Sequence, residues 1–161
     1  YPPRRHRPRR VLGAFAYRRQ LRGAAVYYVR MTKRIEVVGA ALLRDDRVFA
    51  AKRGPMKSMA GYWEFPGGKV EAGETPQEAL VRELREELRI ETRVGEFLTT
   101  TAHDTGSGII ELSTYLCELI AGSPVLTEHS ESRWIPVSEL AGLEWAPADI
   151  PTVELLQERF A

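Results

Sequence analysis

Three glutamates within one short segment have the spacing in this sequence that most directly suggests chemistry. Glu83, Glu86 and Glu87 stand at positions i, i+3 and i+4, and in a helix such residues share one face. Carboxylates packed together repel one another unless cations lie among them. Carboxylate oxygens are the ligands that Mg²⁺ prefers, and proteins often share this ion between carboxylates and substrate phosphates. The cluster therefore predicts a metal and phosphate site, with Mg²⁺ as the expected cofactor and Mn²⁺ as the alternative.

The same segment also fits a solvated acidic helix face, with Arg82 and Arg85 as ion-pair partners of the glutamates. Most glutamate-rich helices have no more role than that. The solvated face, however, leaves unexplained the pair Gly67-Gly68 and the acidic Glu74, which precede the helix at fixed offsets. The functional interpretation is therefore favoured.

A helix must position these glutamates, and its start is visible in the sequence. The run from Thr75 to Glu78 is a capping box, in which Thr75 caps the helix and Glu78 returns to the cap. Pro76 suits the first turn, because its missing N–H costs nothing there. Apolar residues of the same helix form a stripe expected to pack on a sheet: Leu80, Leu84 and Leu88, joined by Val81.

Strands are expected both before and after this helix in the sequence. Apolar runs at 35–43 and 48–51, separated by the turn-forming pair Asp45-Asp46, predict a hairpin. The other predicted elements are strands at 63–65, 93–101, 109–119 and 134–136, and a closing helix at 150–160. Because strands and helices mix without strict alternation, the chain is expected to fold as an α+β layered domain.

The segment 68–90 resembles the Nudix box. The residues that match it in type and spacing are Gly68, Glu74, Arg82, Glu83, Leu84, Glu86 and Glu87. A chance match has a probability on the order of 10⁻⁷ per start position. Arg89 departs from the pattern, because the family has glycine there. A non-glycine residue leaves the helix in the left-handed conformation at a cost of roughly 1 kcal/mol.

The resemblance implies a Nudix fold, an α/β/α sandwich around a mixed β-sheet. It also implies a Mg²⁺-dependent enzyme that splits a nucleoside triphosphate into a monophosphate and pyrophosphate. Residues at the positions of Arg82 and Glu74 have supporting roles in the family: the first orients a metal-binding glutamate and the second supports the loop and helix start. The metal ligands that the resemblance carries over are Gly67, through its carbonyl, and Glu83, Glu86, Glu87 and Glu128.

Beyond the box, the resemblance extends from about residue 33 to the end of the chain. The segments 51–53, 63–69 and 145–151 are similar to the MutT branch, which acts on oxidised guanine nucleotides, and to bacterial relatives active on cytidine nucleotides. The positions that line the nucleotide in this branch are Arg53, Glu64, Phe65, Pro66, Gly67, Gly68 and Asp149. Two assignments keep simple alternatives: Arg53 as a strand-end charge and Glu128 as plain surface.

Asp149 stands where MutT has an asparagine that reads the guanine edge. An ionised carboxylate has no hydrogen to donate, which suits the exocyclic amine of cytosine. A protonated carboxyl would also serve oxidised guanine, so both bases stay open. The structural alternative is a helix cap, since Ile150-Pro151 begins the closing helix.

Three further residues receive no chemical role. His103 and His129 are isolated histidines in predicted loops, where such residues are more often solvated. Cys117, the only cysteine, lies in an apolar run and is expected to be a buried strand residue. With no disulfide possible and no uncharged apolar run of about twenty residues, a reducing cytoplasmic setting without a membrane span is expected.

Residues 1–32 form a basic extension that is expected to lie outside the Nudix domain at 33–161. Nine of the 23 basic residues and none of the 22 acidic residues fall within 1–30, which leaves a formal net charge of −8 for the rest. The extension would suit a nucleic-acid-binding arm or a targeting segment. The favoured interpretation is a head translated from upstream of a start at Met31.

The expected partner is therefore a nucleoside triphosphate substrate. No stable nucleic-acid partner is expected, and a monomer and a homodimer fit equally well. A non-catalytic nucleotide- or RNA-binding Nudix module is the alternative function. Its weakness is that a module that only binds has no need of three clustered carboxylates.

Overall fold

The computed structural model describes residues 32–161, so the predictions for residues 1–31 lie outside the described part of the chain. Strands β1 (Arg34–Arg44) and β2 (Arg47–Lys52) form the predicted antiparallel hairpin. Its turn begins at Asp45, whose φ of 55° is left-handed, a conformation that aspartate adopts more readily than most residues.

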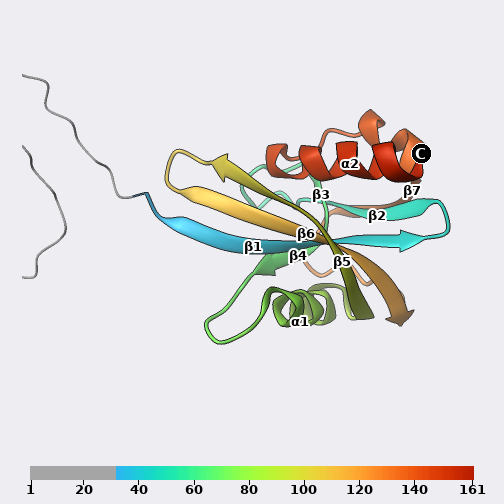
Figure 1. Ribbon diagram of the computed structural model, residues 1–161, viewed down its shortest axis with the longest axis horizontal. Helices are drawn as coiled ribbons and strands as arrows, with labels where there is room; N and C mark the ends of the chain where they lie inside the picture. Colours follow the sequence, from blue (N-terminus) through green and yellow to red (C-terminus); the bar gives the residue numbers. More distant parts are fainter. Residues whose placement is uncertain (1–31) are drawn as a thin grey trace, which may run out of the picture. The chain divides into compact units, whose positions relative to one another are not determined.

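The strands form a mixed sheet with β1 at its centre (Figure 1). Strand β1 runs parallel to β6 and antiparallel to β2 and β4, while β5 pairs antiparallel with β6. Strand β2 also pairs antiparallel with β3 and β7. The remaining strands are β3 (Trp63–Glu64), β4 (Gly67–Lys69), β5 (Glu91–Asp104), β6 (Ile109–Ala121) and β7 (Glu131–Pro136).

Two helices cover opposite faces of this sheet: α1 (Pro76–Leu88) and α2 (Ile150–Phe160) (Figure 1). Alternate residues of β1 face the two layers, as strand geometry requires. Ala40 packs in the cluster under α1, and Ala41 packs in the cluster under α2. The predicted α/β/α sandwich with a mixed sheet is confirmed.

The start of α1 is the predicted capping box. The Thr75 hydroxyl accepts a hydrogen bond from the Glu78 amide at 3.1 Å, and the Glu78 carboxylate accepts one from the Thr75 amide at 2.8 Å. The C-cap of α1 is Arg89, whose backbone is left-handed (φ 56°, ψ 39°) although the residue has a side chain. The start of α1 is therefore set by local sequence, whereas its end has the left-handed geometry without the glycine that favours it.

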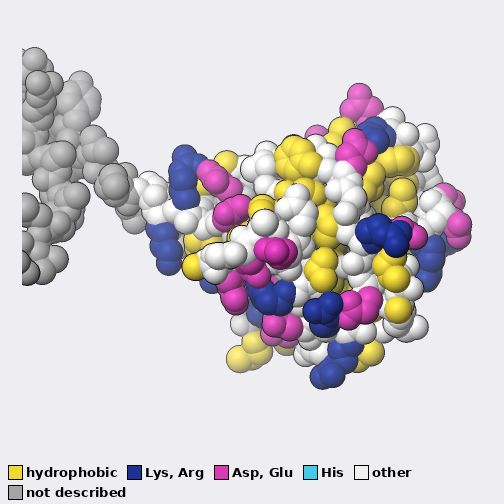
Figure 2. Space-filling model, turned by 60° about the horizontal axis from the view of Figure 1, so that its bottom comes forward, with side chains coloured by type: hydrophobic (Ala, Val, Ile, Leu, Met, Phe, Trp, Pro, Cys, Tyr) yellow, Lys and Arg dark blue, Asp and Glu magenta, His cyan; other side chains and the backbone are white. Residues whose placement is uncertain are grey.

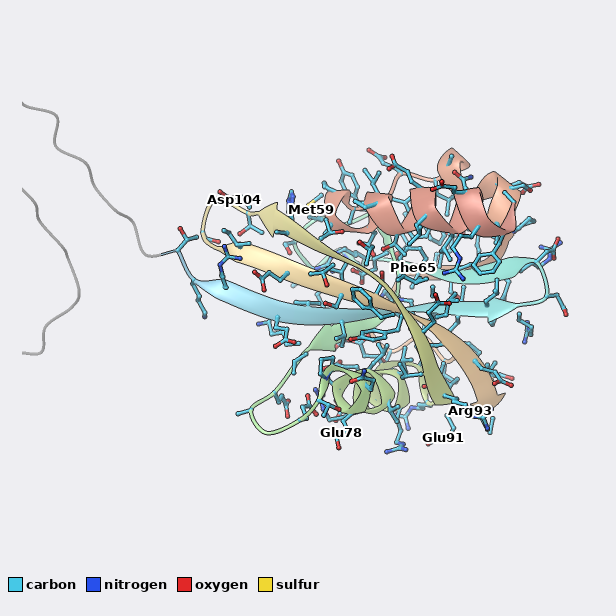
Figure 3. All side chains as sticks on the ribbon, viewed as in Figure 1. Met59, Phe65, Glu78, Glu91, Arg93 and Asp104 are labelled. Carbon is cyan, nitrogen blue, oxygen red and sulfur yellow. The ribbon has the colours of Figure 1, made fainter. Side chains whose placement is uncertain are left out.

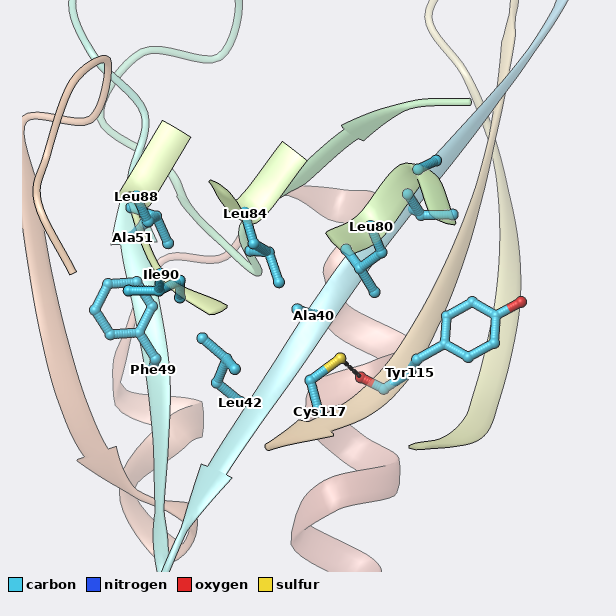
Figure 4. Packing of buried hydrophobic residues seen from close by; sticks show 12 residues of the cluster. Ala40, Leu42, Phe49, Ala51, Leu80, Leu84, Leu88, Ile90, Tyr115 and Cys117 are labelled. Carbon is cyan, nitrogen blue, oxygen red and sulfur yellow. Dashed lines mark hydrogen bonds between the residues drawn. The ribbon is translucent and has the colours of Figure 1, made fainter. Parts of the chain in front are cut away.

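The packed face of α1 differs from the prediction at one position. Leu80, Leu84 and Leu88 are fully buried above the sheet (Figure 4), but Ala79 joins them and Val81 is only half-buried. The buried face is therefore turned away from Val81 and toward the side of the helix that carries the glutamates.

Other boundaries also differ from the prediction. Strand β5 continues to Asp104, so the turn before β6 is shorter than expected. Strand β4 and the 3₁₀ helices η1 (Val137–Gly142) and η2 (Pro147–Asp149) were not predicted. Cys117 is buried as expected, and burial raises the pKa of its thiol to about 12. Within residues 32–161, no helix has the length and apolarity needed to cross a membrane.

Candidate active site

The glycine pair before α1 brings the backbone of β4 against two neighbours. A Cβ atom at Gly67 would lie 1.9 Å from the carbonyl oxygen of Val38 in β1. A Cβ atom at Gly68 would lie 2.3 Å from the carboxyl carbon of Glu83. Neither position has room for a side chain. The absence of a Cβ atom at Gly68 allows the Glu83 carboxylate to contact the backbone of β4 directly.

Arg82 connects this loop to α1. Its guanidinium group holds both carboxylate oxygens of Glu74, at 2.6 and 3.0 Å, and donates to the carbonyl of Lys69 at 3.0 Å. The same group contacts Glu83 at 2.9 Å and Glu86 at 3.3 Å. Arg82 thus fixes the first glutamate of the cluster and the loop in one arrangement.

The hydrogen bond from Arg82, followed by one from the backbone of Glu71, lowers the pKa of Glu74. The neighbouring Glu74 in turn raises the pKa of Arg82. Both groups therefore keep their charges. This pair forms a permanent ionic brace between the loop and the helix.

The three glutamates of the cluster differ in burial. The side chain of Glu83 is 14% exposed and that of Glu86 is 61% exposed. Burial raises the pKa of Glu83, and burial together with the charge of Glu83 raises the pKa of Glu87 to about 7. Glu83 and Glu87 follow Leu80 and Leu84 by three residues, so helical geometry places them beside the packed face.

Glu128 is brought into electrostatic range of Glu87, whose pKa it also raises. It belongs to the loop between β6 and β7, and its carboxylate forms an ion pair with Lys57 at 3.1 Å. The loop is held against α1, because the Thr127 hydroxyl donates to the carbonyl of Glu87 at 2.7 Å and the Val125 amide donates to that of Leu88 at 2.9 Å.

The carboxylates suit a divalent cation, although their present partners are cationic side chains. Among residues 32–161, no three acidic, histidine or cysteine side chains form a ready-made metal site. Arg82 and Lys57 take up oxygens of Glu83, Glu86 and Glu128 instead. The hard oxygen donors match Mg²⁺, and the raised pKa of Glu87 marks the negative potential that a cation would relieve. Acidic and basic side chains are interspersed on the α1 side of the molecule (Figure 2).

The predicted nucleotide-lining residues other than Asp149 lie on β3, β4 and the adjoining loops. Arg53, which follows the end of β2, forms an ion pair with Glu64 at 2.6 Å. Pro66 is buried, and its carbonyl accepts a hydrogen bond from the Ala40 amide at 2.8 Å. Phe65 lies in the interior of the molecule (Figure 3) and stacks on Trp145 with ring centroids 4.7 Å apart.

Asp149 is not the side-chain cap of α2. Its backbone is already helical, and its carboxylate makes no capping hydrogen bond. The carboxylate instead accepts a hydrogen bond at 3.1 Å from the amide of Phe65, 84 residues away in the sequence. Burial raises the pKa of Asp149 to about 8. The carboxyl group is therefore protonated at neutral pH, and the premise of an ionised acceptor holds only at higher pH.

The expectation of a solvated His129 is wrong. Its side chain is 5% exposed, and its Nε2 lies 3.0 Å from the carboxylate of Glu64. His103 is half-buried in β5, where it pairs with Ile110. Nothing in the local sequence around His129 indicates burial, because the partner that holds it lies on β3; its only signal is its position next to Glu128.

Known proteins resemble this chain over most of its length. The model of the NUDIX domain family matches residues 33–156. The CTP pyrophosphohydrolase of Escherichia coli K12 is 42% identical over 122 residues, which are 76% of this chain and 90% of that protein. The putative 8-oxo-dGTP diphosphatase 2 of Mycobacterium tuberculosis is 38% identical over 120 residues, which are 70% of this chain and 81% of that protein.

The same relation holds in three dimensions. The solution structure of the DNA mismatch repair protein MutT from methicillin-resistant Staphylococcus aureus 252 aligns with a TM-score of 0.68 at 45% identity, covering 80% of this chain and 98% of that one. The family match includes the glycine pair, the whole of α1 and the loop that carries Glu128. The chain therefore belongs to the Nudix hydrolase family, as a pyrophosphohydrolase of the MutT and CTP pyrophosphohydrolase kind.

Proposed function

We propose that this protein hydrolyses a cytidine or oxidised guanine nucleoside triphosphate to the monophosphate and pyrophosphate, in a reaction that requires Mg²⁺. The observation that supports this most directly is the arrangement of Arg82, which braces Glu74 and Glu83 beside the half-buried Glu87. The named activities of the relatives from E. coli and M. tuberculosis support the two substrate classes.

The residues proposed to hold the metal are Glu83, Glu86, Glu87, Glu128 and the carbonyl of Gly67. When bound, Mg²⁺ would neutralise phosphate oxygens and make a water molecule more acidic. The side chains and backbone of the protein would position the metal ligands and the substrate phosphates, and would accept the proton of the attacking water. Arg82 holds the Glu83 carboxylate still, Gly68 lets substrate phosphates approach the backbone, and a glutamate of the cluster accepts the proton of the attacking water.

In this scheme, water attacks one of the two phosphorus atoms of the α–β phosphoanhydride link, and the bond from that phosphorus to the bridging oxygen breaks. The water oxygen stays on the attacked phosphorus and the bridging oxygen leaves with the other product, which gives the monophosphate and pyrophosphate. On the nucleoside side, we propose that Arg53, Glu64 and Phe65 line the nucleotide and that Asp149 faces the base edge. Such an enzyme would remove damaged or surplus nucleotides from the cellular pool.

A product assay tests this function. The full chain is incubated with dCTP, CTP, 8-oxo-dGTP and dTTP, with Mg²⁺ or with EDTA, and the products are separated by ion-exchange chromatography. We expect equal amounts of monophosphate and pyrophosphate from a cytidine or oxidised guanine nucleotide, and no reaction in EDTA. Release of diphosphate and inorganic phosphate would contradict the proposal, as would binding of all four nucleotides without turnover.

A further inference from the structure

The side chain of His129, in the loop between β6 and β7, is buried. Within the described residues its imidazole has one hydrogen-bond partner. Its Nε2 lies 3.0 Å from Oε1 of Glu64, and only 5% of the side chain is exposed. Its Nδ1 is buried and makes no hydrogen bond to any part of residues 32–161. Because a carboxylate only accepts hydrogen bonds, Nε2 must carry a proton and donate to Glu64.

Glu64 transmits this contact to Arg53. Its other oxygen, Oε2, accepts a hydrogen bond from Nη1 of Arg53 at 2.6 Å. Nε of Arg53 in turn donates to the carbonyl of Ser58 at 2.6 Å. A continuous chain of three hydrogen bonds therefore runs from His129 through Glu64 and Arg53 to the loop at 54–61.

The loop that carries His129 is itself anchored on both sides. The amide of Ser130 donates to the carbonyl of Lys52 at the end of β2, at 3.0 Å. Toward the other end of the loop, Thr127 is bonded to the carbonyl of Glu87 in α1. The imidazole is thus supported by the backbone of two elements and has little freedom to move away from Glu64.

We propose that His129 is a positioning residue for nucleotide binding, which holds Glu64 so that Glu64 orients Arg53 toward the substrate. This role rests on the proposed function, since Arg53 and Glu64 are proposed to line the nucleotide. The imidazole transfers no proton in this scheme. Its loss is expected to weaken nucleotide binding and to leave the chemical step largely intact.

Two substitutions distinguish this role from simple packing. The side-chain amide of His129→Gln reaches the place of Nε2 and keeps a donor toward Glu64, whereas that of His129→Asn reaches only the place of Nδ1. A hydrogen bond to a charged group is strong enough for its loss to be measurable. We expect His129→Asn to raise the KM for dCTP about tenfold with a kcat within about threefold, and His129→Gln to restore most of the KM.

A double-mutant cycle then tests the route of the effect. In a Glu64→Gln background, His129→Asn should change KM much less than it does in the unchanged chain, because the acceptor it served is altered. Affinity for dCMP, measured by calorimetry, should follow the same order and needs no turnover. A wild-type chain that hydrolyses neither a cytidine nor an oxidised guanine nucleotide would contradict the proposed function, while the dCMP series would still test His129.

Nitrogen NMR of the unchanged protein gives a measurement that does not depend on any variant folding. We expect the His129 ring to carry its proton on Nε2 and the signal to shift when dCMP binds. An unprotonated Nε2 would overturn the proposal. A His129→Gln variant with the same defect as His129→Asn, or equal effects of His129→Asn in both Glu64 backgrounds, would also overturn it.

Discussion

Glu87 differs from Glu86 because of where each stands around α1, although the two are adjacent in the sequence. Glu87 follows Leu84 by three residues and precedes the buried Leu88, so it lies at the edge of the packed face. Glu86 lies farther from that face and is largely exposed. At the scale of single residues, the helix thus provides one half-buried carboxylate and one that is largely exposed to water.

Glu87→Gln is expected to reduce kcat/KM by at least about a hundredfold, because a charged ligand is lost while the shape of the side chain is kept. The fold should persist. Steady-state hydrolysis at limiting Mg²⁺ measures the loss, and thermal melting with and without Mg²⁺ measures metal binding. Mg²⁺ should raise the melting temperature of the variant less than it raises that of the unchanged chain.

Glu154→Gln is the matched control, because it makes the same chemical change at an exposed position of α2. This variant should be as active as the unchanged chain. Near-normal turnover of Glu87→Gln at limiting Mg²⁺ would show that α1 does not carry the metal site.

Asp149 is expected to make base preference depend on pH. Burial raises its pKa to about 8; the Phe65 amide and Arg53 lower it, and Glu64 raises it. Below that pH the neutral carboxyl both donates and accepts, so it suits the edges of cytosine and thymine alike. Above it, the carboxylate only accepts, which suits the amine of cytosine and opposes the carbonyl of thymine. The ratio of kcat/KM for dCTP over dTTP should therefore rise with pH.

The ratio is measured from about pH 6.5 to about pH 8.8, a range that brackets this pKa and stays below that of the thymine ring. Effects of pH on the shared chemical step cancel in the ratio. The Asp149→Asn variant, which has no ionisable group, should give a smaller preference for dCTP that does not change with pH. A constant ratio in the unchanged chain, or a pH-dependent one in the variant, would show that Asp149 does not read the base.

At the scale of elements, the predictions that are confirmed have local causes. The start of α1 follows from the reciprocal hydrogen bonds of Thr75 and Glu78, which lie three residues apart, and the hairpin of β1 and β2 follows from one turn. The missed features depend on distant partners. Strand β4 exists because Gly67 and Gly68 pair with β1, residues that precede them by almost thirty positions.

The same contrast explains the errors within the candidate site. A capping rule applied to Asp149 considers only its neighbours, but the amide of Phe65 competes for the carboxylate from 84 residues away. His129 is buried by Glu64, which is 65 residues away. The glutamates and Arg82 could be predicted because one helix carries them all. The network around Glu64 could not, because three separate segments form it.

Arg89→Gly tests the exit of α1. Arg89 is exposed and left-handed, so glycine should remove a backbone cost without removing packing. We expect the free energy of unfolding to rise by up to about 1 kcal/mol, measured by urea denaturation, with unchanged kcat. Arg85→Gly, a control within the same helix, should lower it by about 1 kcal/mol or more, since Arg85 is helical and pairs with Glu91. A destabilised Arg89→Gly would mean that the arginine side chain supports the fold.

At the scale of the whole molecule, residues from segments far apart in the described sequence make up the candidate site. Glu64 and Arg53 come from the β2–β3 region, and Asp149 comes from the start of α2. The metal-binding candidates come from β4, α1 and the loop between β6 and β7. The mixed sheet places these segments together, because β1 pairs with both β2 and β4. All of the proposed site residues thus lie within residues 32–161.

A chain that begins at Met31 is therefore expected to fold and to hydrolyse free nucleotides as fast as the full chain. The hydrogen bond from the Ile109 amide to the carbonyl of Lys33, at 2.8 Å, ties the start of the described domain to β6, and the shortened chain keeps it. Nine arginines are lost from residues 1–30, so the remaining chain is acidic and should attract a triphosphate less at low salt. This difference in KM should fade as ionic strength rises from about 0.01 M to about 0.1 M, because the screening length falls from roughly 30 to 10 Å.

Circular dichroism of the shortened chain and kinetics at both salt concentrations measure the outcome. A shortened chain that does not fold would show that residues 1–30 belong to the domain, and a salt-independent loss of kcat would show that they contribute to the site.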